Sequence, residues 1–282
     1  MKLSVFLLFF LLAQHAVYAG DLDHSTTLYD LGLKGNVHSV RETSSKAIVK
    51  NDSIIAGKRK RWHKEDLDFY IVLNNQGYKI EKSLYNDKDA LISRLTYEYD
   101  DRHNVTKEQK YNPDGTLTEK NEFNYKYDDS GKKTEKAWKN GRKVKFAYDD
   151  FGRIKDETYY LADGSFERRE SFMYDINGNV LEDISYKSDE SIGLKIIYRH
   201  NDKGLKVEET WFDLGSKFII KYLYNYDEFG NVIKLQWLDK NNKVYRTYKH
   251  TYNYDAQGNW ITDIVYQNDK PLYVYVREIK YF

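Results

Sequence analysis

Aromatic and apolar residues alternate with polar ones along most of the chain, and the alternation is interrupted by short polar turns. The stretch from Tyr224 to Val232 shows the unit most clearly: Tyr-Asn-Tyr, then Asp227 to Gly230, then Asn-Val. Two aromatics spaced by two residues share one face of a strand. Asp at the first turn position accepts backbone N–H groups, and Gly at the fourth tolerates the left-handed conformation of a bulged type I turn. The stretch therefore predicts strand, turn and strand.

The same unit returns about every 26 residues when the turns are aligned on their fourth position. The aligned positions are Gly77, His103, Gly131, Gly152, Gly178, Gly204, Gly230 and Gly258. The best-matched turn pairs are Asp128 and Gly131, Asp149 and Gly152, Asp175 and Gly178, Asp227 and Gly230, and Asp255 and Gly258. A weaker turn lies midway in each repeat, so one repeat holds two strands. We expect an all-β antiparallel meander of about sixteen to eighteen strands that forms a long twisted or curled sheet.

The register of the bulged turn also predicts which residues share a face. It places Tyr226 opposite Val232 and Tyr254 opposite Trp260. Continuing that parity assigns Tyr85, Tyr111, Tyr160, Tyr186, Phe212, Leu238 and Tyr266 to the same aromatic face. The alternate positions Glu98, Lys126, Arg199, Asn225, Glu108, Glu157, Asp183 and Asp263 are then expected to face water.

The first residues are typical of a secretory signal peptide. Lys2 supplies a positive charge, an apolar run follows, and Val17-Tyr18-Ala19 provides a cleavage site. We predict a signal peptide over 1–19, a leader over 20–30 and a β-repeat domain over 31–282, with a long loop at 50–65. Leu33 to Thr43 is predicted to be the return strand of a truncated first unit. The protein is expected to be periplasmic, cell-surface or secreted, without an integral membrane span.

Composition narrows the chemistry. The chain has no cysteine, which excludes disulfides and thiolate sites. Its 45 Lys and Arg nearly balance its 44 Asp and Glu, so no nucleic-acid partner is expected. The 27 tyrosines argue against disorder, which is poor in aromatics.

Catalytic motifs are missing from the sequence. It has no Gly-x-Ser-x-Gly elbow, its histidines have no metal-ligand spacing, and adjacent carboxylates on a strand point to opposite faces. We predict no catalytic, cofactor or metal residues. The candidate binding surface comprises Trp138, Trp211, Trp237, Trp260, Arg59, Arg61 and Trp62. These tryptophans can instead fill the aromatic face of the sheet, and the basic run can be a solvated loop.

The turn strings carry a family resemblance. Tyr97-Glu98-Tyr99-Asp100, Tyr125-Lys126-Tyr127-Asp128 and the later copies resemble the Tyr-Asp repeats of bacterial Rhs and YD-repeat proteins, over about residues 69–282. The resemblance implies a long β-strip, which in large members of the family curls into a hollow shell around a toxin domain.

Three functional hypotheses follow. The first is a non-enzymatic exported bacterial β-repeat protein that acts in recognition, with an unknown protein or glycan ligand, or as an envelope structural element. The second is an envelope glycan- or peptidoglycan-acting hydrolase, whose carboxylates come from separate strands and meet in one cleft about 5 to 10 Å apart. The third is a partner of a toxin system.

Overall fold

The computed structural model describes residues 27, 28, 31–60, 67–213 and 215–282. These residues form a single antiparallel sheet of 19 strands and no helix. The strands are β1 (Val37–Lys50), β2 (Ser53–Arg59), β3 (Asp68–Leu73), β4 (Lys79–Tyr85), β5 (Leu91–Tyr99), β6 (Val105–Tyr111), β7 (Leu117–Tyr127), β8 (Lys133–Trp138), β9 (Lys143–Tyr148), β10 (Ile154–Tyr160), β11 (Phe166–Tyr174), β12 (Val180–Tyr186), β13 (Ile192–His200), β14 (Lys206–Asp213), β15 (Lys217–Tyr226), β16 (Val232–Leu238), β17 (Val244–Tyr254), β18 (Trp260–Gln267) and β19 (Lys270–Tyr281).

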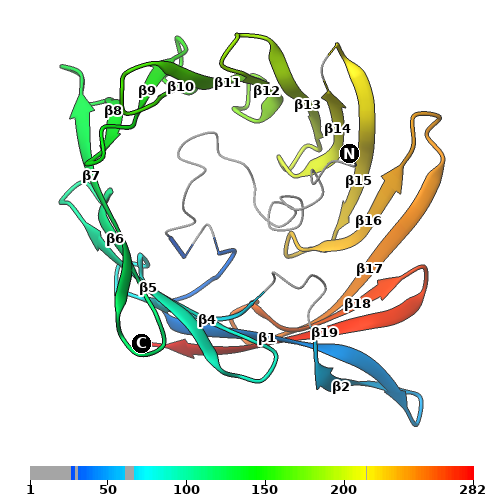
Figure 1. The fold of residues 1–282 in the computed structure, drawn as a ribbon. Helices are drawn as coiled ribbons and strands as arrows, with labels where there is room; N and C mark the ends of the chain where they lie inside the picture. The colour runs from blue at the N-terminus through cyan, green and yellow to red at the C-terminus, as the bar shows by residue number, and fades with distance from the viewer. Residues whose placement is uncertain (1–26, 29–30, 61–66, 214) are drawn as a thin grey trace, which may run out of the picture.

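The sheet closes on itself. Each strand from β3 to β19 pairs with its neighbours in sequence, and β1 pairs with β19 on one side and β3 on the other. All strands except β2 therefore form an 18-strand barrel, seen as a ring in Figure 1. The expected all-β antiparallel meander is confirmed, and the sheet expected to be long and twisted or curled goes further and closes into a barrel. Closure is favourable because it leaves no unpaired sheet edge in the ring.

The long loop predicted at 50–65 is wrong for its first half. Ser53–Arg59 is strand β2, which pairs with the second half of β1 through a two-residue turn at Asn51 and Asp52, both with positive φ. The β-branched pairs Ile48–Ile55 and Val49–Ile54 explain the strand conformation. Residues 61–66 lie outside the described residues.

The Tyr-Asp turns share one geometry. In the turn after β11, the Oδ1 atom of Asp175 accepts the backbone N–H groups of Asn177 at 2.9 Å and Asn179 at 2.8 Å. Gly178 has φ +88°, in the left-handed region that a Cβ atom disfavours. His103 occupies the equivalent position with φ 62°. The turn therefore explains why Asp and Gly recur in the repeat.

A β-bulge follows each of these turns and reverses the facing of the next strand. Tyr174 pairs with Val180, but Met173 pairs with Glu182, so Leu181 is an extra residue. Asp183 consequently lies opposite the buried Phe172. The same shift turns Glu108, Glu157 and Asp263 to the inner face, although the alternation expected them in water. A prediction that carries parity through the turn fails because the bulge adds one residue.

The bulge also moves aromatics at the strand ends to the outer face, where the alternation had not placed them. Tyr160 follows the inward Tyr159, and the Lys143 ammonium lies 5.6 Å from its ring centre. Arg169 covers Tyr186 in the same way at 4.4 Å. Such contacts combine apolar burial with cation–π attraction.

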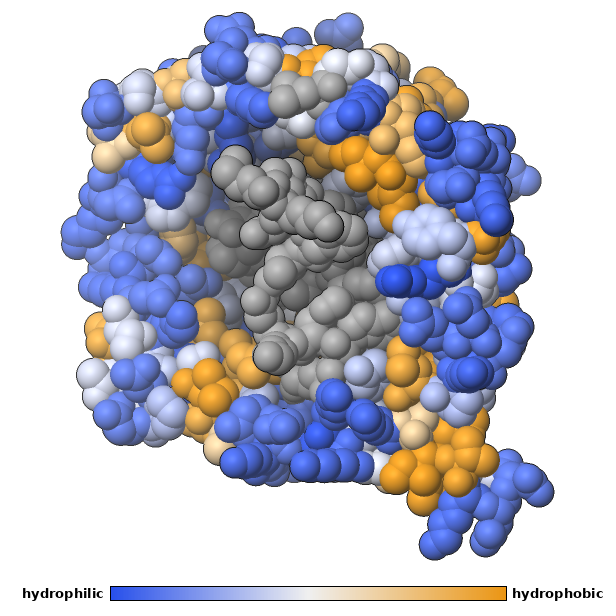
Figure 2. Space-filling model, turned by 45° about the vertical axis from the view of Figure 1, so that its right-hand side comes forward, coloured by the Kyte–Doolittle hydropathy of each residue, from blue (hydrophilic) through white to orange (hydrophobic). Residues whose placement is uncertain are grey.

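The rest of the outer face is mostly hydrophilic, with hydrophobic side chains in small separate groups (Figure 2). Ion pairs join neighbouring strands there, such as Lys107 to Glu98 at 2.7 Å and Lys195 to Glu182 at 2.6 Å. Exposed pairs of this kind each contribute little to stability. They make the outside of the barrel compatible with water.

The seam between β19 and β1 is a repeat unit divided between two distant segments. Tyr281 pairs with Val37, and the N–H of Phe282 donates to the carbonyl of Asn36 at 3.0 Å. In an intact turn, Tyr226 pairs with Val232, and Asp227 N–H donates to the Asn231 carbonyl at 2.9 Å. Gly35 has φ +80°, like the other turn glycines. The segment predicted to be a truncated first unit therefore supplies the second half of the closing unit.

Candidate functional site

A ring of mostly ionisable side chains runs around the inner face. It consists of the fifth residue after each turn position, and we call it the inner belt. Its members are Lys82, Glu108, Lys136, Glu157, Asp183, Glu209, Leu235 and Asp263. Each follows its turn by the same number of residues and the same bulge, so the members lie at one height in the barrel.

Carboxylates gather on one side of this belt. Glu157 of β10 pairs directly with Glu170 of β11, and Asp183 of β12 and Glu209 of β14 lie on the following strands of the same face. We call these four residues the acidic arc. Like charges directly opposite each other on a sheet are unfavourable. The arrangement therefore stores electrostatic repulsion on the inner face.

The repulsion among these carboxylates contributes to raised pKa values in the acidic arc. Burial, with added repulsion from Glu170, Glu157 and Glu209, raises the pKa of Asp183 to about 7. Burial also raises the pKa of Glu170 above its ordinary value, against the opposing effect of Ser185 and Arg168. Both groups therefore favour their neutral forms more than free carboxylic acids do.

Neighbouring side chains hold the other two carboxylates. The Tyr159 hydroxyl donates to Glu157 at 2.6 Å. Glu209 accepts hydrogen bonds from the Trp211 indole N–H and from the Tyr224 hydroxyl, and it forms an ion pair with Lys206. These bonds hold the carboxyl groups of Glu157 and Glu209 in place as hydrogen-bond acceptors.

The opposite side of the inner face is basic. The Lys136 ammonium lies 4.7 Å from the ring centre of Phe123, and that of Lys79 lies 4.5 Å from Tyr97. Lys82 belongs to the same group, and burial lowers its pKa. The inner face thus carries Lys79, Lys82 and Lys136 on β4 to β8, with Glu108 of β6 between them, and the acidic arc on β10 to β14.

The four candidate tryptophans are part of the barrel wall. Trp138, Trp211 and Trp237 share the seventh position after the turn, and Trp260 lies at the second. Trp211, Trp237 and Trp260 are only 7%, 8% and 6% exposed. Arg246 covers Trp237 and Arg277 covers Trp260, at 4.6 and 3.6 Å. Their faces are therefore occupied by protein groups.

The candidate basic residues are only partly described. Arg59, at the end of β2, forms an ion pair with the buried carboxylate of Asp68. Arg61 and Trp62 lie outside the described residues. The structure thus does not bring Arg59 together with the tryptophans of the wall.

A set of tyrosine hydrogen bonds between repeats was missed by the sequence reasoning. In each, the hydroxyl donates to a backbone carbonyl 20 residues earlier, at the bulge of the preceding repeat. The pairs are Tyr99 to Lys79, Tyr125 to Val105, Tyr174 to Ile154, Tyr226 to Lys206 and Tyr252 to Val232. A bulge interrupts the strand ladder, and the hydroxyl supplies a bond at that point. The constant spacing was a signal that could have revealed it.

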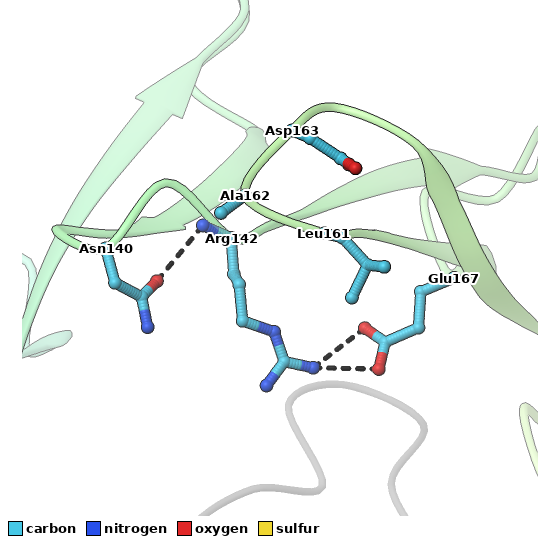
Figure 3. A pocket seen from close by; sticks show the side chains of 6 residues that line it. All are labelled: Asn140, Arg142, Leu161, Ala162, Asp163 and Glu167. Atoms are coloured by element: carbon cyan, nitrogen blue, oxygen red, sulfur yellow. Dashed lines mark hydrogen bonds and ion pairs between the residues drawn. The ribbon is translucent and has the colours of Figure 1, made fainter.

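A pocket lies between two midway turns, those that contain Asn140 and Asp163 (Figure 3). It is lined by Asn140, Arg142, Leu161, Ala162, Asp163 and Glu167. Arg142 Nη2 donates to both oxygens of Glu167 at 2.8 Å. Asp163 accepts from the Ser165 hydroxyl and N–H, which lower its pKa. The two carboxylates of the pocket, Asp163 and Glu167, therefore already have hydrogen-bond partners within the protein.

The described residues were also compared with the requirements of a metal site and of a membrane-spanning helix. No group of three or more His, Cys, Asp or Glu residues there is arranged to hold a metal ion. No helix in the described ranges is long and apolar enough to cross a membrane.

The closed barrel, its Tyr-Asp turns and the hydroxyl bonds between repeats define a shell made of YD repeats. The Teneurin YD-shell family model matches residues 58–275, and the chain belongs to this family. The resemblance to YD-repeat proteins seen in the sequence is confirmed. A search of curated proteins gave no match.

Several solved structures match the chain at low identity and low TM-score. A porin-like protein from Bacteroides uniformis is 11% identical with a TM-score of 0.42, covering 90% of this chain and 98% of that chain. The TcdB2-TccC3-Cdc42 structure is 12% identical with a TM-score of 0.38, and the match covers 83% of this chain and 15% of that chain. The Photorhabdus luminescens Tc holotoxin pore is 11% identical with a TM-score of 0.38, and the match covers 83% of this chain and 14% of that chain. The chain thus matches only a small part of the two toxin chains.

Proposed function

We propose that this protein is an exported, non-enzymatic β-shell that holds a basic segment of a protein partner against the acidic arc of its inner face. The observation that carries the proposal is the cluster of Glu157, Glu170, Asp183 and Glu209 on the inner face of strands β10, β11, β12 and β14. A bound lysine or arginine side chain relieves the repulsion within this cluster.

The dimensions of the barrel support a partner inside it. A barrel of about eight strands is filled by its own side chains, whereas barrels of about 16 to 18 strands leave further space. An extended basic peptide is narrow enough for such a space and complements the arc in charge. Export is proposed from the N-terminal sequence, which lies outside the described residues.

A protein partner is favoured over a glycan because of the tryptophans. Sugar binding by stacking needs an accessible ring face, but arginine side chains cover Trp237 and Trp260. Trp211 is directed to Glu209 by its hydrogen bond. The aromatic residues therefore serve the wall of the shell in this proposal.

The test is a binding titration with a labelled ten-residue oligolysine peptide, and an oligoglutamate of equal length as comparison. We expect oligolysine to bind and oligoglutamate not to bind. The double variant Glu170→Gln with Asp183→Asn should weaken oligolysine binding about tenfold, the loss of roughly 1.4 kcal/mol. Glu98→Gln removes a carboxylate from the outer face and is the matched control. Equal losses in both variants contradict an inner site.

The hydrolase remains a second candidate because of one observation. Asp183, with its pKa raised to about 7, lies near the carboxyl groups of Glu170, Glu157 and Glu209, and an acid–base mechanism uses carboxyl groups with unequal pKa values. A turnover assay on peptidoglycan fragments separates the two functions. Cleavage that Asp183→Asn abolishes supports the hydrolase, and binding of oligolysine without any cleavage supports the shell.

A further inference from the structure

The hairpin of β1 and β2 has an unusual surface for an exposed element. Figure 1 shows it leaving the ring and pointing away from it. Its aliphatic side chains lie in water on both faces: Ile48 and Val49 are 46% and 63% exposed, and Ile55 is 43% exposed. Paired residues share a face, so Ile48 and Ile55 lie on one side, and Val49 and Ile54 on the other.

The outer edge of β2 is open. No other described strand pairs with β2 except β1. Lys50 and Ser53 flank the two-residue turn and form a hydrogen-bonded pair, and Ile48 with Ile55 is the next such pair. Ile54 and Ala56 lie at the alternate positions, so their N–H and C=O groups point to the open edge. An isolated two-stranded ribbon with an open apolar edge favours the addition of a strand.

We propose that this edge pairs with the same edge of a second copy of the chain, so that the two hairpins form one four-stranded antiparallel sheet. With Ile55 on the two-fold axis, Ile54 of each copy lies opposite Ala56 of the other. Both pairs then exchange backbone hydrogen bonds through the groups that point outward. A contact of this kind is isologous, as a two-fold dimer requires.

Charge favours the same register. Antiparallel pairing about Ile55 brings Asp52, in the turn of each copy, toward Lys58 of the other copy, which lies at a β-bulge in β2. The opposite charges attract symmetrically at both ends of the contact. A lipid bilayer is the less suitable partner, because hydrocarbon leaves the N–H and C=O groups of the edge without hydrogen bonds.

The absence of cysteine makes the register directly testable. Ile55→Cys places two thiols at the axis, at the separation of a directly opposed strand pair, within disulfide range. Ile48→Cys is the matched control: it lies on the same face of the same hairpin, but three strand spacings, about 14 Å, from its counterpart. We expect mild oxidation to convert most of the Ile55→Cys protein to a covalent dimer and little of the Ile48→Cys protein.

A second variant tests the contact without a crosslink. Ala56→Pro removes an outward N–H and leaves the bonds between β1 and β2 intact. We expect sedimentation to show a dimer for the unaltered protein and a dimerisation constant at least about tenfold weaker for Ala56→Pro. The proposal is overturned if both cysteine variants crosslink alike or neither does. It is also overturned if the unaltered protein stays monomeric in sedimentation. Binding of that monomer to anionic phosphatidylglycerol vesicles would assign the hairpin to a lipid surface instead, and it likewise overturns the proposal.

Discussion

The inner face of the barrel destabilises the charged form of a single residue, Asp183. Burial and three neighbouring carboxylates raise its pKa to about 7. A raised pKa means that the folded state binds the proton more tightly than the unfolded state does, where the value is near 3.9. The contribution of Asp183 to stability is therefore fully present below about pH 4 and is lost as pH rises through 7.

This sign leads to a measurable prediction. Asp183→Asn should increase the free energy of unfolding at pH 8 by about 2 kcal/mol, less than the full shift implies because the side chain is partly exposed. At pH 4 the change should be near zero. Urea denaturation from pH 4 to 8 measures both values. Asp150→Asn, in an exposed turn, is the control, and a parallel pH dependence in the two variants contradicts the assignment.

The tyrosine hydroxyls act at the same scale but link repeats. The Tyr174 hydroxyl donates to the Ile154 carbonyl at 2.6 Å, beside the bulge. Tyr174→Phe keeps the ring and removes this bond, so we expect a loss of about 0.5–1.5 kcal/mol in chemical denaturation. Tyr245→Phe removes a hydroxyl from a side chain that is 51% exposed and should cost close to nothing. Similar costs for the two variants would show that the bond between repeats adds no stability.

At the scale of the strand and its turn, backbone conformation decides the outcome. Gly230 has φ +89°, and a Cβ atom there meets nothing closer than 4.0 Å, at Leu205. The cost of Gly230→Val therefore comes from the left-handed conformation alone, about 1–3 kcal/mol. Gly230→Asn should cost clearly less, because Asn tolerates this region. Equal losses for Val and Asn in chemical denaturation exclude the conformational explanation.

At the scale of the whole molecule, the divided repeat at the seam predicts a circular permutant. Joining residue 282 directly to Leu33, with Phe282→Asp, produces Tyr-Asp-Leu-Lys-Gly-Asn-Val. This segment has the same length as the intact turn Tyr226 to Val232. It also has the same residues at the Tyr, Asp, Gly, Asn and Val positions. New ends between Asn241 and Asn242 open an exposed midway turn. The permutant should fold, because the join completes a turn that the barrel already contains.

The measurement is thermal unfolding against the unpermuted chain that begins at Leu33. We expect the permutant to melt within a few degrees of it or higher, since the aspartate restores the turn hydrogen bonds. A short Gly-Ser insertion between Asn241 and Asn242 of the unpermuted chain is the control for opening that turn. A permutant that fails to fold while the insertion variant is unaffected contradicts the divided-repeat description of the seam.

The sequence by itself determined the strands and turns of the repeats, although it missed strand β2. Tyr-x-Tyr, Asp and Gly act within a few residues of one another, so strand propensity and left-handed turn positions such as Gly178 can be recognised locally. The same locality made the repeat and its family resemblance visible. Expected pairs such as Tyr226 with Val232 are present because the turn alone sets them.

Tertiary structure decided the facing of the strands, the closure and the candidate site. One extra residue in each bulge reverses the facing of the following strand, which is why Glu157 and Asp183 face inward. Closure depends on twist accumulated over all strands and on Tyr281 meeting Val37 across the seam. The acidic arc combines a local and a long-range effect: the bulges turn its carboxylates inward, and strand pairing brings carboxylates from separate repeats onto nearby strands, a proximity that no local pattern encodes.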